Sequence, residues 1–175
     1  MNLYLRLLFT LLRAWRSPRL APGDTLVRQW HVLPNDIDVN GHMNNGRYLT
    51  LIDLMLAEYF VRIGFVPGMV KHGWRPMAGG SFITYRRGLE AFQSYTLRFR
   101  LDASDVHWNY MRFEFMRDGR VCASGYMKGA AVGPDGLVPN ARSYAAIGLA
   151  PFGAELPAPV RNWLAAETGL MNAAW

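Results

Sequence analysis

The segment from Asn35 to Asn45 concentrates side chains that could take part in chemistry: two aspartates, four asparagines and one histidine around Gly41. Tyr48 to Val61 is then apolar at helical spacing. Because asparagine and aspartate favour turns and helix caps, we predict a polar loop that caps a long, mostly buried helix beginning near Asn44. Carboxylate, carboxamide and imidazole groups would lie beside the unpaired N–H groups of a helix N-terminus. The alternative is an elaborate cap with no further role.

The elements that position this loop indicate an α+β chain. The helix should run to about Ile63 and end at Gly64, Pro67 and Gly68. It is apolar nearly all round, so a curved antiparallel sheet of about five strands should wrap it. Asp118-Gly119 lies between two alternating runs and predicts a hairpin. The expected strands are Asp24 to Leu33, Trp74 to Arg87, Tyr95 to Asp102, Trp108 to Met116 and Val121 to Val132.

Two terminal segments flank this core, which gives three parts: 1–20, 24–134 and 135–175. Residues 1–20 predict an amphipathic helix whose polar stripe is Asn2, Arg6, Thr10, Arg13 and Ser17. It is too short to span a bilayer. It could pack on the folded body or on a partner subunit, or residues 1–16 could lie on a membrane surface as a peripheral contact. In the tail, Pro159 to Thr168 could form a short helix.

Composition narrows the functional classes. The length of 175 residues favours one globular domain. The net charge is +6, but the arginines are spread along the chain and do not form the basic cluster that nucleic-acid binding needs, so no nucleic-acid role is expected. Cys122 is the only cysteine, which suits a reducing compartment and a cytoplasmic location, with the inner membrane surface as a peripheral alternative. Asp36-Ile37-Asp38-Val39-Asn40-Gly41 copies half an EF-hand loop, but Arg47 stands where that loop needs glutamate. We expect no metal and no cofactor.

The motif itself resembles that of the hotdog-fold thioesterases. Strand, D-x-D-x-x-G-H-x-N-N-x-x-Y, long helix and antiparallel run are similar to the branch of 4-hydroxybenzoyl-CoA thioesterase and the plant acyl-ACP thioesterases, and to its thioesterase-superfamily-member-6-like group. The matching residues are Asp36, Asp38, Gly41, His42, Asn44, Asn45 and Tyr48, followed by Asp53, Tyr85-Arg86-Arg87 and Arg117-Asp118-Gly119. The resemblance covers roughly residues 24–134.

The resemblance implies a hotdog fold, a homodimer or dimer of dimers, and hydrolysis of an acyl-CoA or acyl-carrier-protein thioester. Asp38 would be the nucleophile or general base, with Asn40 and His42 assisting. Amides near Asn45 and Gly46 would form the oxyanion hole. The structural alternatives are a cap or turn for Asp38, an Asx-turn for Asn40 and a backbone-bonded buried histidine for His42. The further catalytic position of the plant enzymes has no match here.

Other residues have two interpretations each. Asp53, on an apolar helix, could pair with Arg86 or Arg87 of either subunit, or could activate a water across the dimer interface. Ser81 and Thr84 could line the site or be ordinary strand residues. Basic side chains that could bind the CoA phosphates, or form a solvated face, are Lys71, Arg75, Arg86 and Arg87.

The competing function is a non-hydrolytic acyl-thioester-binding protein, which would retain intact ligand instead of releasing free thiol. A hydratase or dehydratase would also use aspartate or glutamate with histidine, but their usual spacing has no match here.

Overall fold

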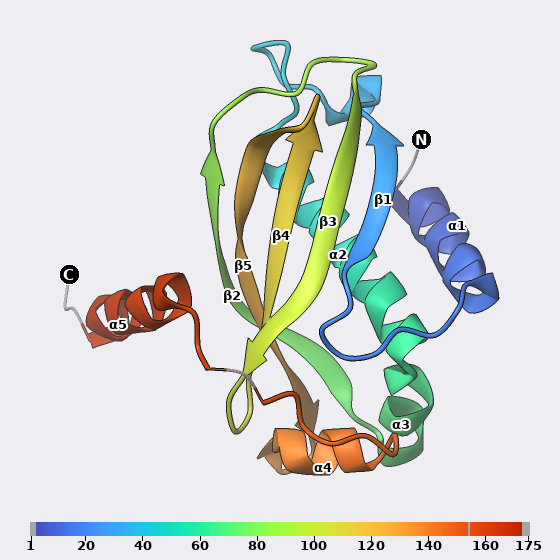
Figure 1. Cartoon of the computed structure of the whole chain (residues 1–175), viewed down its shortest axis with the longest axis vertical. Helices are drawn as coiled ribbons and strands as arrows, with labels where there is room; N and C mark the ends of the chain where they lie inside the picture. Colours follow the sequence, from blue (N-terminus) through green and yellow to red (C-terminus); the bar gives the residue numbers. More distant parts are fainter. Residues whose placement is uncertain (1–2, 154, 173–175) are drawn as a thin grey trace.

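A curved antiparallel sheet wraps one long helix, in a computed structural model that describes residues 3–153 and 155–172 (Figure 1). The strand order is β1-β3-β4-β5-β2, and the short β6 pairs with β5. The strands are β1 (Leu26–His31), β2 (Arg75–Tyr85), β3 (Ser94–Ser104), β4 (Asn109–Arg117), β5 (Arg120–Gly133) and β6 (Gly136–Leu137). Each strand that the alternating pattern predicted is present, with bounds shifted by only a few residues.

The long helix is α2 (Asn45–Ile63), which lies behind the sheet in Figure 1. Asn44 caps its start, and Gly64 ends it in the left-handed conformation at φ 83°. Its apolar side packs on the inner face of the sheet, where Leu51, Met55 and Phe113 are almost completely buried. The predicted position of this helix is therefore confirmed at both ends.

A second short helix, α3 (Phe65–His72), follows directly, and the sequence interpretation missed it. We expected Pro67 and Gly68 to stop helical structure. Pro67 instead lies in the first turn of α3, where a missing N–H costs no hydrogen bond. Gly68 lets the helix approach Ile147 so closely that a Cβ there would lie 2.9 Å from its Cγ2.

The β4–β5 connection is the predicted Asp-Gly hairpin. Arg117 pairs with Arg120, and Asp118 and Gly119 both have positive φ, 50° and 71°. Positive φ at both central residues defines a type I′ turn, whose twist matches that of the flanking strands.

Three further helices surround this core: α1 (Leu3–Arg16), α4 (Asn140–Ala145) and α5 (Ala158–Asn172). Helix α1 packs beside α2, and α4 closes the lower end of the sheet in Figure 1. Helix α5 covers part of the outer sheet face, where Val160 and Trp163 contact a second apolar cluster around Tyr110 and Tyr126. No helix in the described part of the chain is long and apolar enough to cross a bilayer.

Candidate functional site

The polar loop before α2 is a small hairpin fixed by backbone hydrogen bonds. Ile37 pairs with Met43, and the Asp38 N–H donates to the His42 carbonyl at 2.9 Å. Gly41 turns the chain with φ 78°, a conformation that favours glycine. Met43 also donates its N–H to the Leu89 carbonyl at 2.7 Å, which attaches the loop to the segment after β2. The loop is thus a defined structure and not a loose connection.

Asp38 lies half-buried in this loop, with its carboxylate aimed at its own backbone. Its Oδ1 accepts the Asn40 N–H at 2.8 Å, which is an Asx-turn. The side chains of Asn40 and His42 are exposed. The structure therefore brings Asp38, Asn40 and His42 together on one loop, while no hydrogen bond joins their side chains to one another among the described residues.

The His42 ring packs over Gly88, the residue that follows Arg87. A Cβ at Gly88 would lie 2.2 Å from His42 Cδ2, so any larger residue there would force the imidazole to move. His42 also forms an isolated β-bridge with Glu90. His42 is consequently placed between the loop and the arginine-rich end of β2, and it is not the buried, backbone-bonded histidine of the structural alternative.

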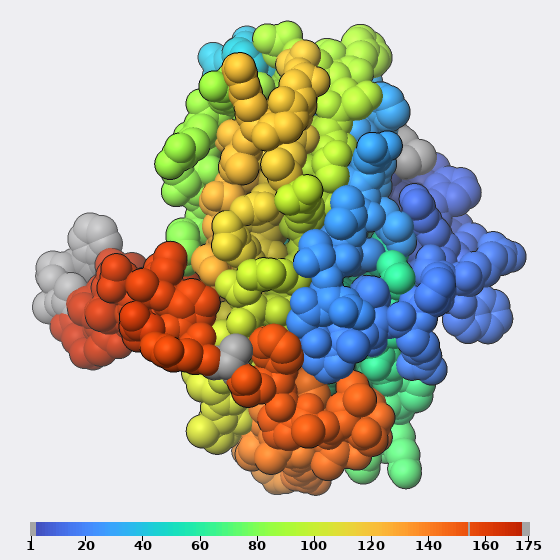
Figure 2. Space-filling model, viewed as in Figure 1, coloured from blue at the N-terminus to red at the C-terminus, as the bar shows by residue number. Residues whose placement is uncertain are grey.

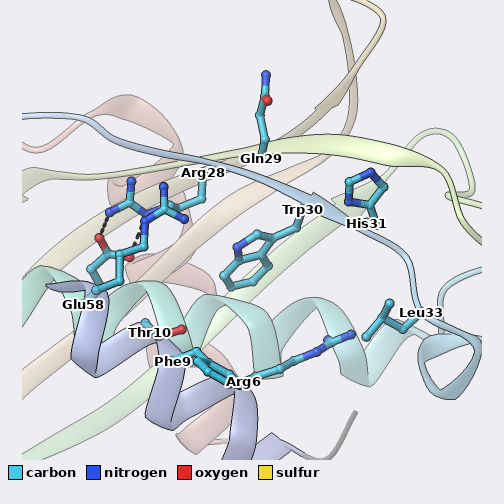
Figure 3. A pocket seen from close by; sticks show the side chains of 10 residues that line it. Arg6, Phe9, Thr10, Arg28, Gln29, Trp30, His31, Leu33 and Glu58 are labelled. Carbon is cyan, nitrogen blue, oxygen red and sulfur yellow. Dashed lines mark hydrogen bonds and ion pairs between the residues drawn. The ribbon is translucent and has the colours of Figure 1, made fainter.

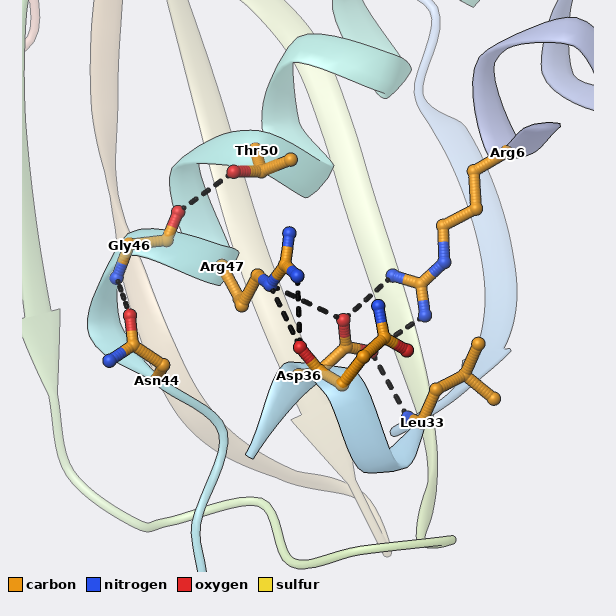
Figure 4. Close-up of polar contacts among 8 residues, drawn as sticks. Arg6, Leu33, Asp36, Asn44, Gly46, Arg47 and Thr50 are labelled. Carbon is orange, nitrogen blue, oxygen red and sulfur yellow. Dashed lines mark hydrogen bonds and ion pairs between the residues drawn. The ribbon is translucent and has the colours of Figure 1, made fainter. Parts of the chain in front are cut away.

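The start of α2 offers one free amide. The Gly46 N–H donates to the Asn44 side-chain oxygen at 2.9 Å (Figure 4). The Arg47 N–H donates to the Asn44 carbonyl at 2.8 Å. The Asn45 N–H has no acceptor in the described part of the chain, while the Asn45 carbonyl accepts the Tyr85 hydroxyl at 3.2 Å. Of the two expected oxyanion donors, Asn45 is available and Gly46 is occupied by the cap.

Asp36, the first aspartate of the motif, has a different environment from Asp38. It is completely buried and accepts two hydrogen bonds from the Arg6 guanidinium, at 2.6 and 3.1 Å. The Leu33 N–H donates to it at 3.0 Å, and Arg47 lies 3.6 Å away (Figure 4). Asp36 therefore ties α1, the loop and α2 together. The sequence interpretation missed this pairing, although Arg6 on the polar stripe of the first helix was the available signal.

The buried carboxylate of α2 is Glu58 and not Asp53. Glu58 is 1% exposed and pairs with Arg28 of β1, and Arg62 lies 3.5 Å away one helical turn later. Asp53 is exposed on the protomer surface, and the expected pairing with Arg86 or Arg87 is absent from the described residues of this chain. The surrounding protein still desolvates Asp53 enough to raise the pKa of its carboxyl above the ordinary value.

Ser81 and Thr84 point to opposite faces of the sheet. Ser81 pairs with Met127, which packs in the main core, so Ser81 shares the inner face with α2. Thr84, three residues on, faces the other side because side chains alternate along a strand. Asp53 and Ser81 are both exposed.

Exposed arginines gather beside the loop, where the chain leaves β2 and turns from β4 into β5. One hollow is lined by Arg87, Gly88, Arg117, Asp118, Arg120 and Cys122. A neighbouring hollow adds Arg86 and Arg112, which pairs with Glu114. Since the His42 ring packs over Gly88, the arginine cluster adjoins the Asp38 loop. Lys71 and Arg75 lie elsewhere, at the α3–β2 junction.

A separate groove of about 280 Å³ lies between α1 and β1 (Figure 3). Apolar side chains in it are Phe9, Trp30 and Leu33, and the Arg28–Glu58 pair closes one end. Local sequence patterns do not indicate this groove, because it is lined by residues of both α1 and β1 and forms only in the folded chain.

The fold and the loop together define a hotdog domain, and comparisons with known proteins agree. The model of the thioesterase-like superfamily matches residues 32–166, and the chain belongs to that family. Solved structures with the same fold include a probable thioesterase from Bartonella henselae, with TM-score 0.59 and 16% identity over 66% of this chain and 97% of that one. A gentisyl-coenzyme A thioesterase superposes with TM-score 0.60 and 18% identity, over 67% of this chain and 98% of that one.

Relatives with higher identity are the THEM6 proteins of two vertebrates. The Xenopus laevis protein is 36% identical over 94 residues, which are 53% of this chain and 45% of that protein. The Danio rerio protein is 33% identical over 94 residues, 53% of this chain and 46% of that protein. The matched part thus spans about half the length of these curated relatives. The family match continues past residue 134 into the C-terminal segment.

Proposed function

We propose that this chain hydrolyses an acyl-CoA thioester, with a fatty-acyl or aryl group, and that Asp38 is the catalytic carboxylate. Membership of the thioesterase-like superfamily supports thioester hydrolysis. The observation that supports the assignment most directly is the hairpin loop, which holds a solvent-accessible carboxylate next to the start of α2.

The chemistry needs one base and one site for the developing negative charge. Asp38 takes a proton from water, and the hydroxide attacks the thioester carbonyl. Alternatively, Asp38 attacks directly and water hydrolyses the resulting anhydride. The Asn45 N–H, at the positive end of α2, donates to the carbonyl oxygen in the tetrahedral intermediate. In either route this intermediate collapses with cleavage of the C–S bond. The leaving thiolate takes the proton that Asp38 accepted in the base route, or a proton from water in the direct route, where water hydrolyses the anhydride only after the thiol has left. Asn40 and His42 assist by orienting the water and the thioester oxygen.

The arginine cluster provides the preference for CoA over other thioesters. Arg86 and Arg87 lie at its centre, are exposed, and have no ion-pair partner among the residues that the structure describes. Guanidinium groups bind phosphate oxygens in a bidentate manner. The diphosphate would bind there, and the pantetheine would pass Gly88 and His42 to reach Asp38. Lys71 and Arg75 lie at the opposite end of β2 from Arg86 and Arg87, so they could share this role only if a partner subunit placed them there.

A homodimer completes the site in this proposal. The β2 edge has no neighbouring strand in the described chain, and most of its residues are exposed. Natural proteins rarely leave such a long strand edge uncovered. Pairing of β2 with its copy would cover this edge and would place Asp53 and Ser81 at the interface, where Asp53 would act on the water or substrate of the partner's site.

The test is free-thiol release from a panel of acyl-CoAs by the purified protein. Asp38→Asn should lower kcat/KM by about 10²–10⁴-fold, and the exposed turn variant Asp135→Asn should leave it unchanged. Single turnover in ¹⁸O-labelled water tests for direct attack, because label enters Asp38 only if an acyl-aspartate forms and water then attacks its aspartyl carbonyl. If Asp38→Asn keeps the full rate, the assignment fails.

A second function is supported by one observation, the capping of the Gly46 amide by Asn44. With only the Asn45 amide free, the oxyanion is weakly stabilised, as a protein that binds acyl thioesters without hydrolysing them would tolerate. If no thiol is released while acyl-CoA raises the melting temperature, the chain is a binding module.

A further inference from the structure

Helix α1 is attached to the protein by its polar side. Arg6 forms the buried ion pair with Asp36, and Thr10 and Ala14 are buried against the body. Further contacts fix the chain after the helix, where Leu20 donates its N–H to Arg62 O and the Arg62 guanidinium donates to Pro18 O. Leu7 is the apolar residue of α1 that packs partly on the main core. Of the polar stripe seen in the sequence, Arg6 and Thr10 therefore face inward, Arg13 is exposed, and Asn2 lies outside the described residues.

The apolar side of α1 consequently faces solvent. The exposed side chains are Leu3, Tyr4, Leu5, Leu8, Phe9, Leu11, Leu12 and Trp15, and Tyr4 and Trp15 are 76% and 81% exposed. A surface helix normally buries this stripe and exposes its polar residues. In Figure 2 the helix stands out from the body on one side. A contiguous apolar surface of this kind indicates an interaction site.

The charges around α1 indicate which partner fits. Residues 1–23 contain four arginines and no acidic residue. Arg13 and Arg16 are exposed in the last turns of the helix. Aromatic residues near both ends and arginines that can reach a headgroup layer are the features of helices that lie in a membrane interface. A second copy of the same helix would bring arginine against arginine with no acidic residue on α1 to pair with, which disfavours self-association through this face.

We infer that the outward apolar face of α1 binds the surface of an anionic lipid bilayer, with the folded domain held on the aqueous side. The buried Arg6–Asp36 pair fixes the orientation of α1, so the apolar face is already exposed before the protein meets a membrane. Leu8, Leu12 and Trp15 would enter the interface, and Arg16 would contact lipid phosphate. This inference does not depend on the proposed hydrolysis.

The test is co-sedimentation of the full chain with vesicles of phosphatidylcholine alone, or of phosphatidylcholine and phosphatidylglycerol in equal amounts. The wild type should bind the anionic vesicles and bind the neutral ones weakly. The double variant Leu8→Gln/Trp15→Gln should lower the partition coefficient by at least about tenfold. Arg16→Gln should reduce the preference for anionic vesicles by about fivefold. The matched control is Leu170→Gln/Met171→Gln, two exposed apolar residues of α5, and it should bind like the wild type.

Because Leu8 and Trp15 are exposed, the double variant should keep the wild-type circular dichroism spectrum and melting temperature, so a loss of binding would not reflect unfolding. The inference is overturned if the wild type fails to bind anionic vesicles, or if the double variant binds as well as the wild type. It is also overturned if the double variant changes only the sedimentation coefficient of the free protein, which would make the face an interface between copies of the chain.

Discussion

At the scale of single residues, the motif contains two aspartates with opposite environments. Asp36 is buried and paired with Arg6, whereas Asp38 is half-buried and bonded only within its loop. A sequence pattern cannot separate such residues, because the partner of Asp36 lies 30 residues away in a helix outside the motif. The chemistry available to Asp38 depends on the absence of such a partner, since a carboxylate already held by a guanidinium is a poor base.

Asp36→Asn should destabilise the protein by about 3–5 kcal/mol, because it leaves the largely buried Arg6 guanidinium without its counter-charge. Asp38→Asn should change stability by less than about 1 kcal/mol, since it alters one exposed turn. Urea unfolding of the wild type and both variants at neutral pH measures these changes in the free energy of unfolding. Equal losses would contradict the assignment of Asp36 to structure and Asp38 to chemistry.

Replacing Asp53 by asparagine should raise the stability of the protein and lower its activity. Its raised pKa means that ionising the carboxyl costs more in the folded than in the unfolded chain. This cost is absent below the ordinary pKa of 3.8 and is fully present above the raised folded pKa. Asp53→Asn should therefore stabilise the protein at pH 7, by no more than about 1 kcal/mol because solvent screens the exposed group.

The stability difference between Asp53→Asn and the wild type should disappear as the pH falls below about 3.8, which unfolding curves across the pH range would detect. In the proposed mechanism the same variant loses thioesterase activity. A variant that is less stable than the wild type at pH 7 would show that the carboxylate has a favourable partner, and would remove the argument for a desolvated acid at this position.

At the scale of elements, the strands, the long helix and the Asp-Gly hairpin followed from local patterns in the sequence. The alternation and the helical spacing of apolar residues are properties of short stretches of sequence, so they predict strands and helices without knowledge of tertiary contacts. Helix α3 was missed because a proline in a first turn looks like a terminator when the helix start is unknown. The orientation of α1 was missed because it depends on Asp36, and Glu58 was overlooked although Arg62 lies one turn away. Contacts between distant segments were thus the unpredictable part.

The loop and the segment after β2 act as one unit through Gly88. Gly88→Ala should displace the His42 ring, because the new Cβ would lie 2.2 Å from His42 Cδ2. The imidazole is the exposed end of a flexible side chain, so we expect a loss of less than about 1 kcal/mol in stability but about tenfold in kcat/KM if His42 assists catalysis. Gly153→Ala, where a Cβ meets nothing within 4 Å, is the control.

A Gly88→Ala variant with full activity would mean that His42 has no positioned role. A Gly88→Ala, His42→Ala double variant separates the two effects. If Gly88 acts only by placing His42, the double variant should be no slower than His42→Ala alone.

At the scale of the whole molecule, the proposal requires two chains at each site. Asp38 lies on the loop before α2, Asp53 lies on the exposed side of α2, and β2 is an open edge of the sheet. If β2 pairs with its copy, Asp53 of one protomer assists Asp38 of its partner. Asp38→Asn and Asp53→Asn homodimers should then both be nearly inactive. Mixing and reassembling them should restore roughly a quarter of the wild-type rate, since half of randomly paired dimers carry one intact site of two.

A variant that cannot form the dimer is the control for this mixing experiment. Met77 is exposed on the β2 edge, and Met77→Glu introduced into both variants would place like charges at the paired strands. Sedimentation velocity should then show monomers, and mixing should restore no activity. Val106→Glu, on an exposed loop between β3 and β4, should leave both the dimer and the recovery intact. If mixing the two inactive variants restores nothing although heterodimers form, each site is built from a single chain, and Asp53 has no role across the interface.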